Sequence, residues 1–309
     1  MYEINQMNQK IKWNSSHITD QSEKIFLITG ASSGLGKEAS IVLANKNAKI
    51  IMAVRNVLKA TTLKDEILKT NPKANIDIQF LDLTQLSSVK SFCESIILKY
   101  DRIDVLICNA GIMMCPFSKT SDGFEIQMGT NHLGHYALVG MLFPILKRTF
   151  NSRIVITSSL AHKQGKINFE DIHWDKRKYK TIRAYGDSKL ANLYFAYELI
   201  RKIKDTHDAP MVTICHPGWT KTELDRHYKM AALIGNLVAQ NVQMGTLPTL
   251  RAATDESAKT GDYYGPNGIF EMKGYPVLVD SNKLSKDVLK AQKLWELSEN
   301  LTGVKYDFN

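Results

Sequence analysis

A chain of 309 residues, 44% of them hydrophobic, is long enough to bury a core of its own, and its formal net charge is +9. No uninterrupted apolar run reaches the roughly 18 residues of a membrane span, and the polar segment 1–23 lacks the apolar stretch of a secretory signal. The four cysteines form no C-x-x-C pair, which favours reduced core thiols over disulfides or a metal site. We therefore expect a cytoplasmic protein without a membrane span or a bound metal.

Short apolar segments alternate with segments of helical periodicity from residue 25 onward. This alternation predicts right-handed crossovers and an α/β fold with a doubly wound, mostly parallel, Rossmann-like sheet. No linker rich in Gly, Ser or Pro divides the chain, so we expect one domain over 24–309 behind a polar N-terminal extension, 1–23. The predicted strands are 25–29, 49–54, 76–81, 104–108, 153–158 and 211–215, with a short seventh near 268–271.

Lysine and arginine are spread along the chain, apart from one dense run at 176–183. A solvated loop explains such a run better than a nucleic-acid surface does, and the general excess of positive charge can attract an anionic cofactor. We therefore expect no nucleic-acid partner.

A glycine-rich turn follows the first predicted strand and opens the first helix, with the spacing G-x-x-x-G-x-G after Thr29. Glycines let the backbone approach a pyrophosphate, and the helix N-terminus offers free N–H groups. An ordinary turn is the alternative, but the strand–turn–helix context favours a dinucleotide site. The predicted cofactor contacts here are Gly30, Ser32, Ser33, Gly34, Leu35 and Gly36.

The second predicted strand ends at Val54, which is followed by Arg55. NAD enzymes place an acidic residue near this point, about 20 residues after the glycines, to bind the ribose hydroxyls. A carboxylate would repel a 2′-phosphate, whereas an arginine can donate hydrogen bonds to it. A solvent-facing arginine is the alternative, but the missing acid favours NADP(H) with Arg55 on the 2′-phosphate.

Tyr185 and Lys189 form a Y-x-x-x-K pair at the start of a predicted helix, 184–204, and their spacing puts both side chains on one face. The pair alone is weak evidence, because a Lys-rich chain with 12 tyrosines matches it about once by chance. Its place is informative. It follows Ser159, at the end of the fifth strand, and precedes the His-Pro-Gly turn at 216–218.

These landmarks in this order resemble the short-chain dehydrogenase/reductase family over roughly residues 24 to 275. The sequences around Asn131 and Ser159, and the 26 positions from Ser159 to Tyr185, are similar to the branch of retinol dehydrogenases, WW-domain oxidoreductases and protochlorophyllide reductases. The segment 1–23 lacks the N-terminal anchor of membrane-bound retinol dehydrogenases, so retinol is not the substrate that we expect. The resemblance implies an oxidoreductase with the catalytic residues Asn131, Ser159, Tyr185 and Lys189.

The chemistry of carbonyl reduction fits these side chains, because a hydride from nicotinamide must be matched by a proton on the oxygen. A free tyrosine has a pKa near 10, and an adjacent ammonium lowers the pKa of a phenol. Lys189 would therefore tune Tyr185 as the general acid/base. Ser159 would donate a hydrogen bond to the substrate oxygen, and Asn131 would hold a water that relays protons to Lys189. The alternatives are a capping serine and a mid-helix polar residue.

The resemblance extends the cofactor site to the ends of other predicted strands, and Asp82 could also cap the following helix. Cys108 replaces the first residue of the family's N-N-A-G element. Residues 219–257 are expected to form a helical substrate lid, with Trp219, Leu224, Met230 and Leu233 as candidate walls or as core residues. The further predicted cofactor contacts are Asp82, Leu83, Asn109, Ala110, Gly111, Tyr185, Lys189, Pro217, Gly218, Thr220 and Thr222.

A lid rich in Trp, Leu and Met predicts a fairly apolar carbonyl or alcohol as the small-molecule substrate. The sequence does not decide between a monomer and a homodimer. A non-catalytic NADP(H) sensor or partner-binding protein on the same fold is the alternative to an enzyme. Such relatives commonly lose the tyrosine or the lysine, whereas this chain keeps all four catalytic residues, which favours the enzyme.

Overall fold

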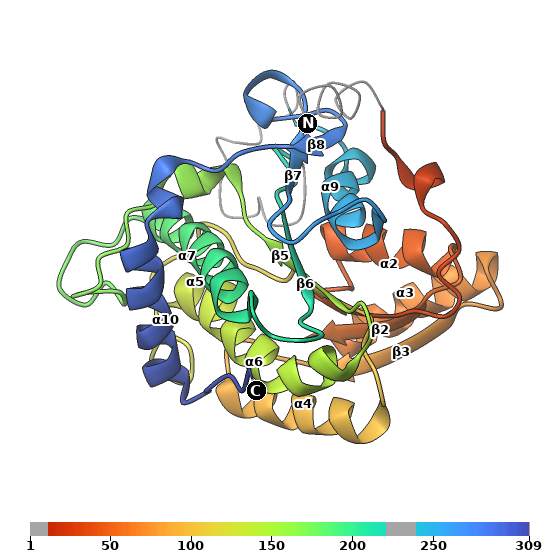
Figure 1. Cartoon of the computed structure of the whole chain (residues 1–309), viewed down its shortest axis with the longest axis horizontal. Helices are drawn as coiled ribbons and strands as arrows, with labels where there is room; N and C mark the ends of the chain where they lie inside the picture. Colours follow the sequence, from red (N-terminus) through yellow and green to blue (C-terminus); the bar gives the residue numbers. More distant parts are fainter. Residues whose placement is uncertain (1–11, 221–238, 309) are drawn as a thin grey trace.

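The computed structural model describes residues 12–220 and 239–308, which build one eight-stranded sheet (Figure 1). Its strand order is β3-β2-β1-β4-β5-β6-β7-β8, and only β8 runs antiparallel to its neighbour. The predicted mostly parallel, Rossmann-like α/β fold is confirmed. The strands are β1 (Ile25–Thr29), β2 (Lys49–Val54), β3 (Asn75–Phe80), β4 (Val105–Cys108), β5 (Arg153–Thr157), β6 (Met211–Cys215), β7 (Tyr263–Pro266) and β8 (Pro276–Leu278).

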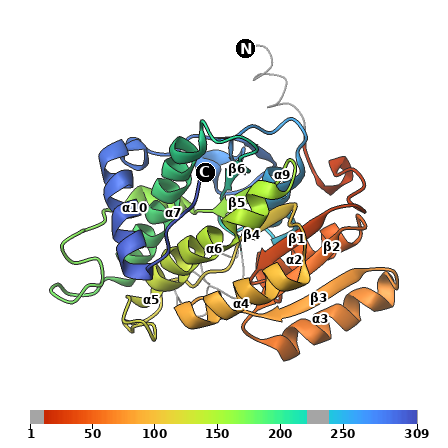
Figure 2. The same cartoon turned by 60° about the horizontal axis from the view of Figure 1, so that its bottom comes forward.

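Two layers of helices cover the sheet, one on each face (Figure 2). Successive strand residues point to opposite faces, so Leu27 joins one apolar cluster while Phe26 and Ile28 join the other. The first cluster packs against α4 (Leu86–Lys99), α6 (Gly134–Arg148) and α7 (Thr181–Ile203). The second packs against α2 (Gly34–Ala44), α3 (Val57–Thr70) and α9 (Val242–Thr254).

The seventh strand lies earlier in the chain than predicted. β7 pairs with β6 through Tyr263 and Tyr264, whereas the predicted strand 268–271 contains the 3-10 helix η5 (Ile269–Glu271). Phe270 and Glu271 have φ angles of 53° and 59°, which an extended strand excludes. The prediction at 268–271 was therefore wrong.

The C-terminal part of the predicted lid, residues 242–254, is the helix α9 and does not form a lid. Every residue from 245 to 254 is buried, and the helix packs against α2 and the strands β5, β6 and β7. It is therefore a layer helix that covers the sheet. Leu224, Met230 and Leu233 lie outside the described residues.

The segments before and after the eight strands are also packed on the fold. Trp13 and Ile18 are buried in the second cluster beside the 3-10 helix η1 (Ser15–His17), so residue 24 marks the start of the sheet and not the edge of the folded body. At the other end, the 3-10 helix η6 (Lys283–Lys286) precedes α10 (Val288–Thr302), which packs along α7.

All four cysteines are free thiols. Cys93, Cys108 and Cys215 are buried, and burial raises the pKa of each thiol, whereas Cys115 is half-buried. Within residues 12–220 and 239–308, no helix is long and apolar enough to cross a membrane, and no group of three His, Cys, Asp or Glu residues could hold a metal ion.

Candidate active site

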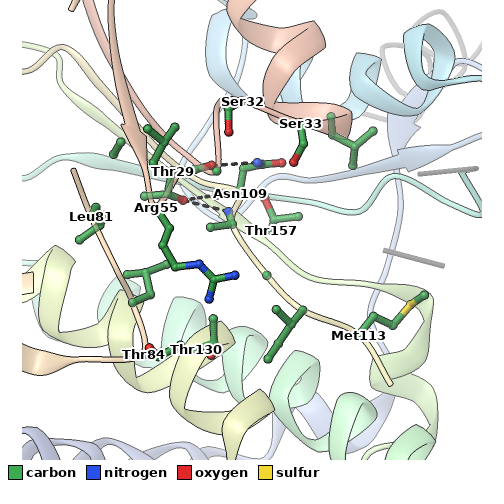
Figure 3. A pocket seen from close by; sticks show the side chains of 18 of the residues that line it. Thr29, Ser32, Ser33, Arg55, Leu81, Thr84, Asn109, Met113, Thr130 and Thr157 are labelled. Carbon is green, nitrogen blue, oxygen red and sulfur yellow. Dashed lines mark hydrogen bonds between the residues drawn. The ribbon is translucent and has the colours of Figure 1, made fainter. Parts of the chain in front are cut away.

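A cavity of about 590 Å³ lies at the carboxyl ends of the parallel strands (Figure 3). β1 has β2 on one side and β4 on the other, so the order of the strands reverses here. Doubly wound sheets bind their ligands at such a point. The predicted site residues that line the cavity are Gly30, Ser32, Ser33, Leu35, Arg55, Asp82, Leu83, Asn109, Ala110, Gly111, Tyr185, Lys189 and Pro217.

Several predicted residues are not part of this lining, and Thr222 lies outside the described residues. The described ones that do not line the cavity are Gly34, Gly36, Asn131, Ser159, Gly218 and Thr220. Other lining residues were missed, although Thr29, Thr157 and Ser158 lie at the ends of predicted strands. The remaining polar ones are Asn56, Lys59, Thr84 and Thr130.

Thr29 ties the end of β1 to the end of β4. Its hydroxyl oxygen accepts from the backbone N–H groups of Asn109 and Ala110, both at 2.9 Å, and Asn109 Nδ2 donates to the Thr29 carbonyl at 2.8 Å (Figure 3). The same hydroxyl lies 2.9 Å from His135 Nε2. Burial lowers the pKa of His135 to about 4, so its ring is neutral. Its Nε2 accepts a hydrogen bond from the Thr29 hydroxyl, while Nδ1–H donates to the Asn131 carbonyl.

The three glycines of the turn have two different roles. Gly30 and Gly34 have φ angles of 67° and 50°, which side-chain-bearing residues rarely adopt. A Cβ on Gly36 would lie 2.3 Å from the Gly30 carbonyl oxygen and 2.6 Å from Asn109 Nδ2. Gly30 and Gly34 therefore shape the turn, whereas Gly36 lets α2 pack closely behind it. Ser33 makes no side-chain cap, so the first N–H groups of α2 remain available to an anion.

Two cations flank the cavity next to the end of β2. Arg55 follows the strand and extends its side chain into the cavity, and Lys59 lies one turn further along, on α3 (Figure 3). Val54, the last residue of β2, stands where an acidic residue is expected in an NAD enzyme. Across the cavity, Asp82 Oδ1 accepts from the Thr84 N–H at 2.9 Å, so Asp82 caps this turn and not α4, whose N-cap is Gln85.

Asn131 lies in a π-helical turn, η2 (Gly129–Leu133), between the short helix α5 (Ile126–Met128) and α6. Its Nδ2 donates to the Ile112 carbonyl and to Ser188 Oγ, both at 2.9 Å, and its Oδ1 accepts from the Ile112 N–H at 2.8 Å. The side chain thus joins the segment after β4 to α7. Both amide protons are engaged, which leaves one lone pair of Oδ1 for a water.

Tyr185 and Lys189 line the cavity from α7. Lys189 Nζ lies 5.9 Å from the centre of the Tyr185 ring and donates to the Thr157 carbonyl at 3.3 Å. Tyr185 is 7% exposed and Lys189 is 4% exposed. Burial lowers the pKa of Lys189 to about 8, so the ammonium is held in a weakly solvated position beside the phenol.

Two serines follow β5 and differ in their partners. Ser158 lines the cavity, but its hydroxyl donates to the Lys189 carbonyl at 3.0 Å. Ser159 is the N-cap of the 3-10 helix η3 (Leu160–Gln164), where its Oγ accepts from the Ala161 N–H at 3.2 Å. A hydroxyl that accepts in this way still has its proton to donate, so the cap is compatible with a bond from Ser159 to a substrate oxygen.

Comparison with known proteins decides the family. Residues 24–232 match the family described as short chain dehydrogenase. The chain belongs to the short-chain dehydrogenase/reductase family. This short-chain dehydrogenase is 35% identical over 289 residues to retinol dehydrogenase 12 of Mus musculus, a match that covers 92% of the chain and 88% of the relative. It is also 35% identical over 293 residues to retinol dehydrogenase 13 of Homo sapiens, covering 91% and 85%. These relatives place it in the retinol dehydrogenase branch.

Solved structures agree with this assignment. The short-chain dehydrogenase superposes on an uncharacterised protein from Mycobacterium paratuberculosis with a TM-score of 0.81 at 35% identity, covering 96% of this chain and 99% of the other. A short chain dehydrogenase from Shigella flexneri complexed with NADP gives a TM-score of 0.62 at 22% identity, covering 79% and 97%, which shows the shared fold alone. Family membership makes the chain an oxidoreductase that uses an NAD(P) cofactor and acts on a small molecule.

Proposed function

We propose that this short-chain dehydrogenase transfers a hydride between NADP(H) and an apolar carbonyl or alcohol, with Tyr185 as the general acid/base. The observation that carries the proposal is that Arg55 and the Tyr185–Lys189 pair line the same cavity. Arg55 follows β2 and the pair lies beside the end of β5, three strand spacings away, or roughly 14 Å. A ligand that reaches both must be extended, as a dinucleotide is.

Preference for NADP(H) follows from the charges next to β2. A 2′-phosphate would meet Arg55 and Lys59 without a carboxylate at position 54 to repel it. The free N–H groups of α2 suit the pyrophosphate at the other side of the glycine turn.

Proton transfer is assigned to the side chains on α7 and after β5. When bound, the nicotinamide supplies or accepts the hydride. During reduction, Tyr185 gives its hydroxyl proton to the substrate oxygen, and the Lys189 ammonium stabilises the phenolate that remains. Ser159 donates a hydrogen bond to the same oxygen as negative charge develops on it. Asn131, through the remaining lone pair of Oδ1, would hold a water on the path to Lys189.

The substrate is proposed to be apolar on chemical grounds. Ile112, Met113 and Cys115 contribute apolar surface to the segment of the cavity that follows β4. The relatives named retinol dehydrogenase carry the name of an apolar alcohol, which agrees with this chemical class.

A screen of aldehydes, ketones and alcohols of graded polarity, with NADPH or NADH, tests the proposal through the absorbance of the reduced nicotinamide. We expect NADPH to be consumed with an apolar aldehyde or ketone. Activity confined to small, highly charged substrates would contradict the substrate class. Tight NADPH binding without turnover across the whole series would favour the non-catalytic alternative.

Replacing Arg55 with alanine should raise the KM for NADPH and leave the KM for NADH nearly unchanged. A lost charge-assisted hydrogen bond to phosphate is worth about 1.5–3 kcal/mol, or roughly ten- to a hundredfold. Lys59→Ala should act in the same direction. The measurement is steady-state kinetics with each cofactor. Equal KM values for NADPH and NADH in the unsubstituted enzyme would rule out the proposed preference.

A further inference from the structure

The loop after β6 is held by segments that come later in the chain. The Trp219 N–H donates to the Met272 carbonyl at 2.7 Å, and the Trp219 carbonyl accepts from the Gln240 N–H at 2.9 Å. Gln240 Nε2 also donates to the Pro217 carbonyl at 2.8 Å. Pro217 lines the cavity, so these contacts determine where the loop meets a ligand.

His216 directly follows β6, and its side chain contacts the backbone of this loop. Its side chain is fully buried; Nδ1 accepts from the Gly218 N–H at 3.2 Å, and Nε2 donates to Glu271 Oε2 at 2.9 Å. One nitrogen accepts and the other donates, so the hydrogen bonds assign a neutral ring protonated at Nε2. Burial lowers the pKa of His216, which agrees with this neutral form.

Glu271 reaches His216 from an unfavourable backbone. Phe270 and Glu271 are both left-handed, and the side chains of Ile269 and Phe270 are 79% and 78% exposed, so burial does not offset the strain there. This backbone brings the Glu271 carboxylate to His216 and the Met272 carbonyl to the loop. Strain that persists in this way points to a constraint from function.

The second carboxylate oxygen of Glu271 extends the connection to the segment after β5. Oε1 lies 3.2 Å from Lys163 Nζ, on the 3-10 helix η3 that Ser159 caps. The neighbouring His162 contacts the Ser159 carbonyl through Nδ1 at 2.6 Å. Burial alone would raise the pKa of Glu271, but the bond from His216 and the charge of Lys163 hold it below its usual value, so the group is a carboxylate.

We propose that Glu271 is a positioning residue for the nicotinamide half of the dinucleotide, acting through His216 on the backbone of Gly218. The inference rests on the proposed function and on the predicted cofactor contacts Pro217 and Gly218, which we assign to the nicotinamide half; Pro217 lines the cavity. Without the carboxylate, His216 is no longer held in the Nε2–H form, and the other tautomer would point a proton at the Gly218 N–H. The loop then loses its fixed position, whereas the adenosine half, at Arg55, keeps its contacts.

Fluorescence titration of the full chain with NADPH, and competition by 2′,5′-ADP, separates the two halves of the cofactor. Glu271→Ala should weaken NADPH binding roughly tenfold and leave 2′,5′-ADP affinity unchanged. Glu271→Gln, whose amide oxygen still accepts from His216, should stay within about twofold of the unsubstituted protein for both ligands. Lys163→Met, the matched control, breaks the ion pair alone and should also keep NADPH affinity.

Three results would overturn the assignment: NADPH affinity unchanged in Glu271→Ala, an equal loss for both ligands, or the same loss in Lys163→Met. Glu271→Gly removes the carboxylate and tolerates the left-handed backbone, so it should show the NADPH loss even where the alanine variant folds poorly. If the unsubstituted protein bound neither ligand, the proposed function itself would fail. Normal binding by the unsubstituted protein with no effect of Glu271→Ala would refute the positioning role alone.

Discussion

Phenylalanine at position 185 is expected to reduce turnover by at least a hundredfold while NADPH still binds. Tyr185→Phe removes only a hydroxyl, and the ring, 7% exposed, keeps its packing on the cavity wall. A positioned general acid contributes about 10²- to 10⁴-fold to the rate, so hydride transfer in a single turnover should fall by that factor. Near-normal turnover in this variant would disprove the catalytic assignment.

Tyr194→Phe is the matched control, because Tyr194 lies on the same helix, is buried in an apolar cluster and does not line the cavity. Its turnover should be unchanged. Ser159→Ala should cost about 2.7–4 kcal/mol of transition-state stabilisation, the value typical of a lost donor to a developing oxyanion. If the two residues act as one unit, adding Ser159→Ala to Tyr185→Phe should reduce the rate little further.

Lys189→Met is expected to make the apo protein more stable near neutral pH while it removes activity. Burial lowers the pKa of Lys189 from 10.5 to about 8, which amounts to about 3 kcal/mol. Below pH 8 both the folded and the unfolded lysine are protonated, and the folded state carries the whole penalty of burying the charge. Methionine removes this penalty but also loses the hydrogen bond to Thr157, which is worth about 1 kcal/mol. The net gain in the free energy of unfolding is the difference between the two.

The sign of the pH dependence makes this prediction specific. Between pH 8 and 10.5 the unfolded lysine binds the proton more tightly than the folded one, so the free energy of unfolding of the unsubstituted protein rises with pH. The advantage of Lys189→Met should therefore shrink across this window. Urea unfolding at several pH values measures it, with Lys204→Met as the control on an exposed lysine of the same chain. A difference that stays constant with pH would contradict the assigned cause.

The sequence predicted β1 to β6 well, because five of them are apolar runs and β3 alternates apolar with polar residues. β7 was missed for a physical reason: Tyr-Tyr-Gly-Pro at 263–266 has the composition of a loop, and its strand character depends on pairing with β6. The helical lid predicted over residues 219–257 contains α9, but the sequence could not show that this helix packs on the sheet.

The candidate site was predicted where motifs end strands and was missed where contacts are long-range. Lys59 could have been found, because it stands four residues after Arg55 in a helical segment. Glu271 could not have been found from the sequence, because it contacts His216 across 55 positions. The contact also depends on left-handed φ angles at Phe270 and Glu271, which neither residue type predicts. The partners of Asn131, which are Ile112 and Ser188, are likewise distant in the sequence.

The distribution of thiols gives the protein a built-in chemical reporter. Three cysteines are buried with raised pKa values, whereas Cys115 lines the cavity and is partly exposed. An alkylating reagent at mildly alkaline pH, which compensates for the raised pKa of Cys115, would therefore mark this position ahead of the others. The rate of that labelling reads out cavity occupancy, so ligands can be ranked by mass spectrometry before any turnover assay exists.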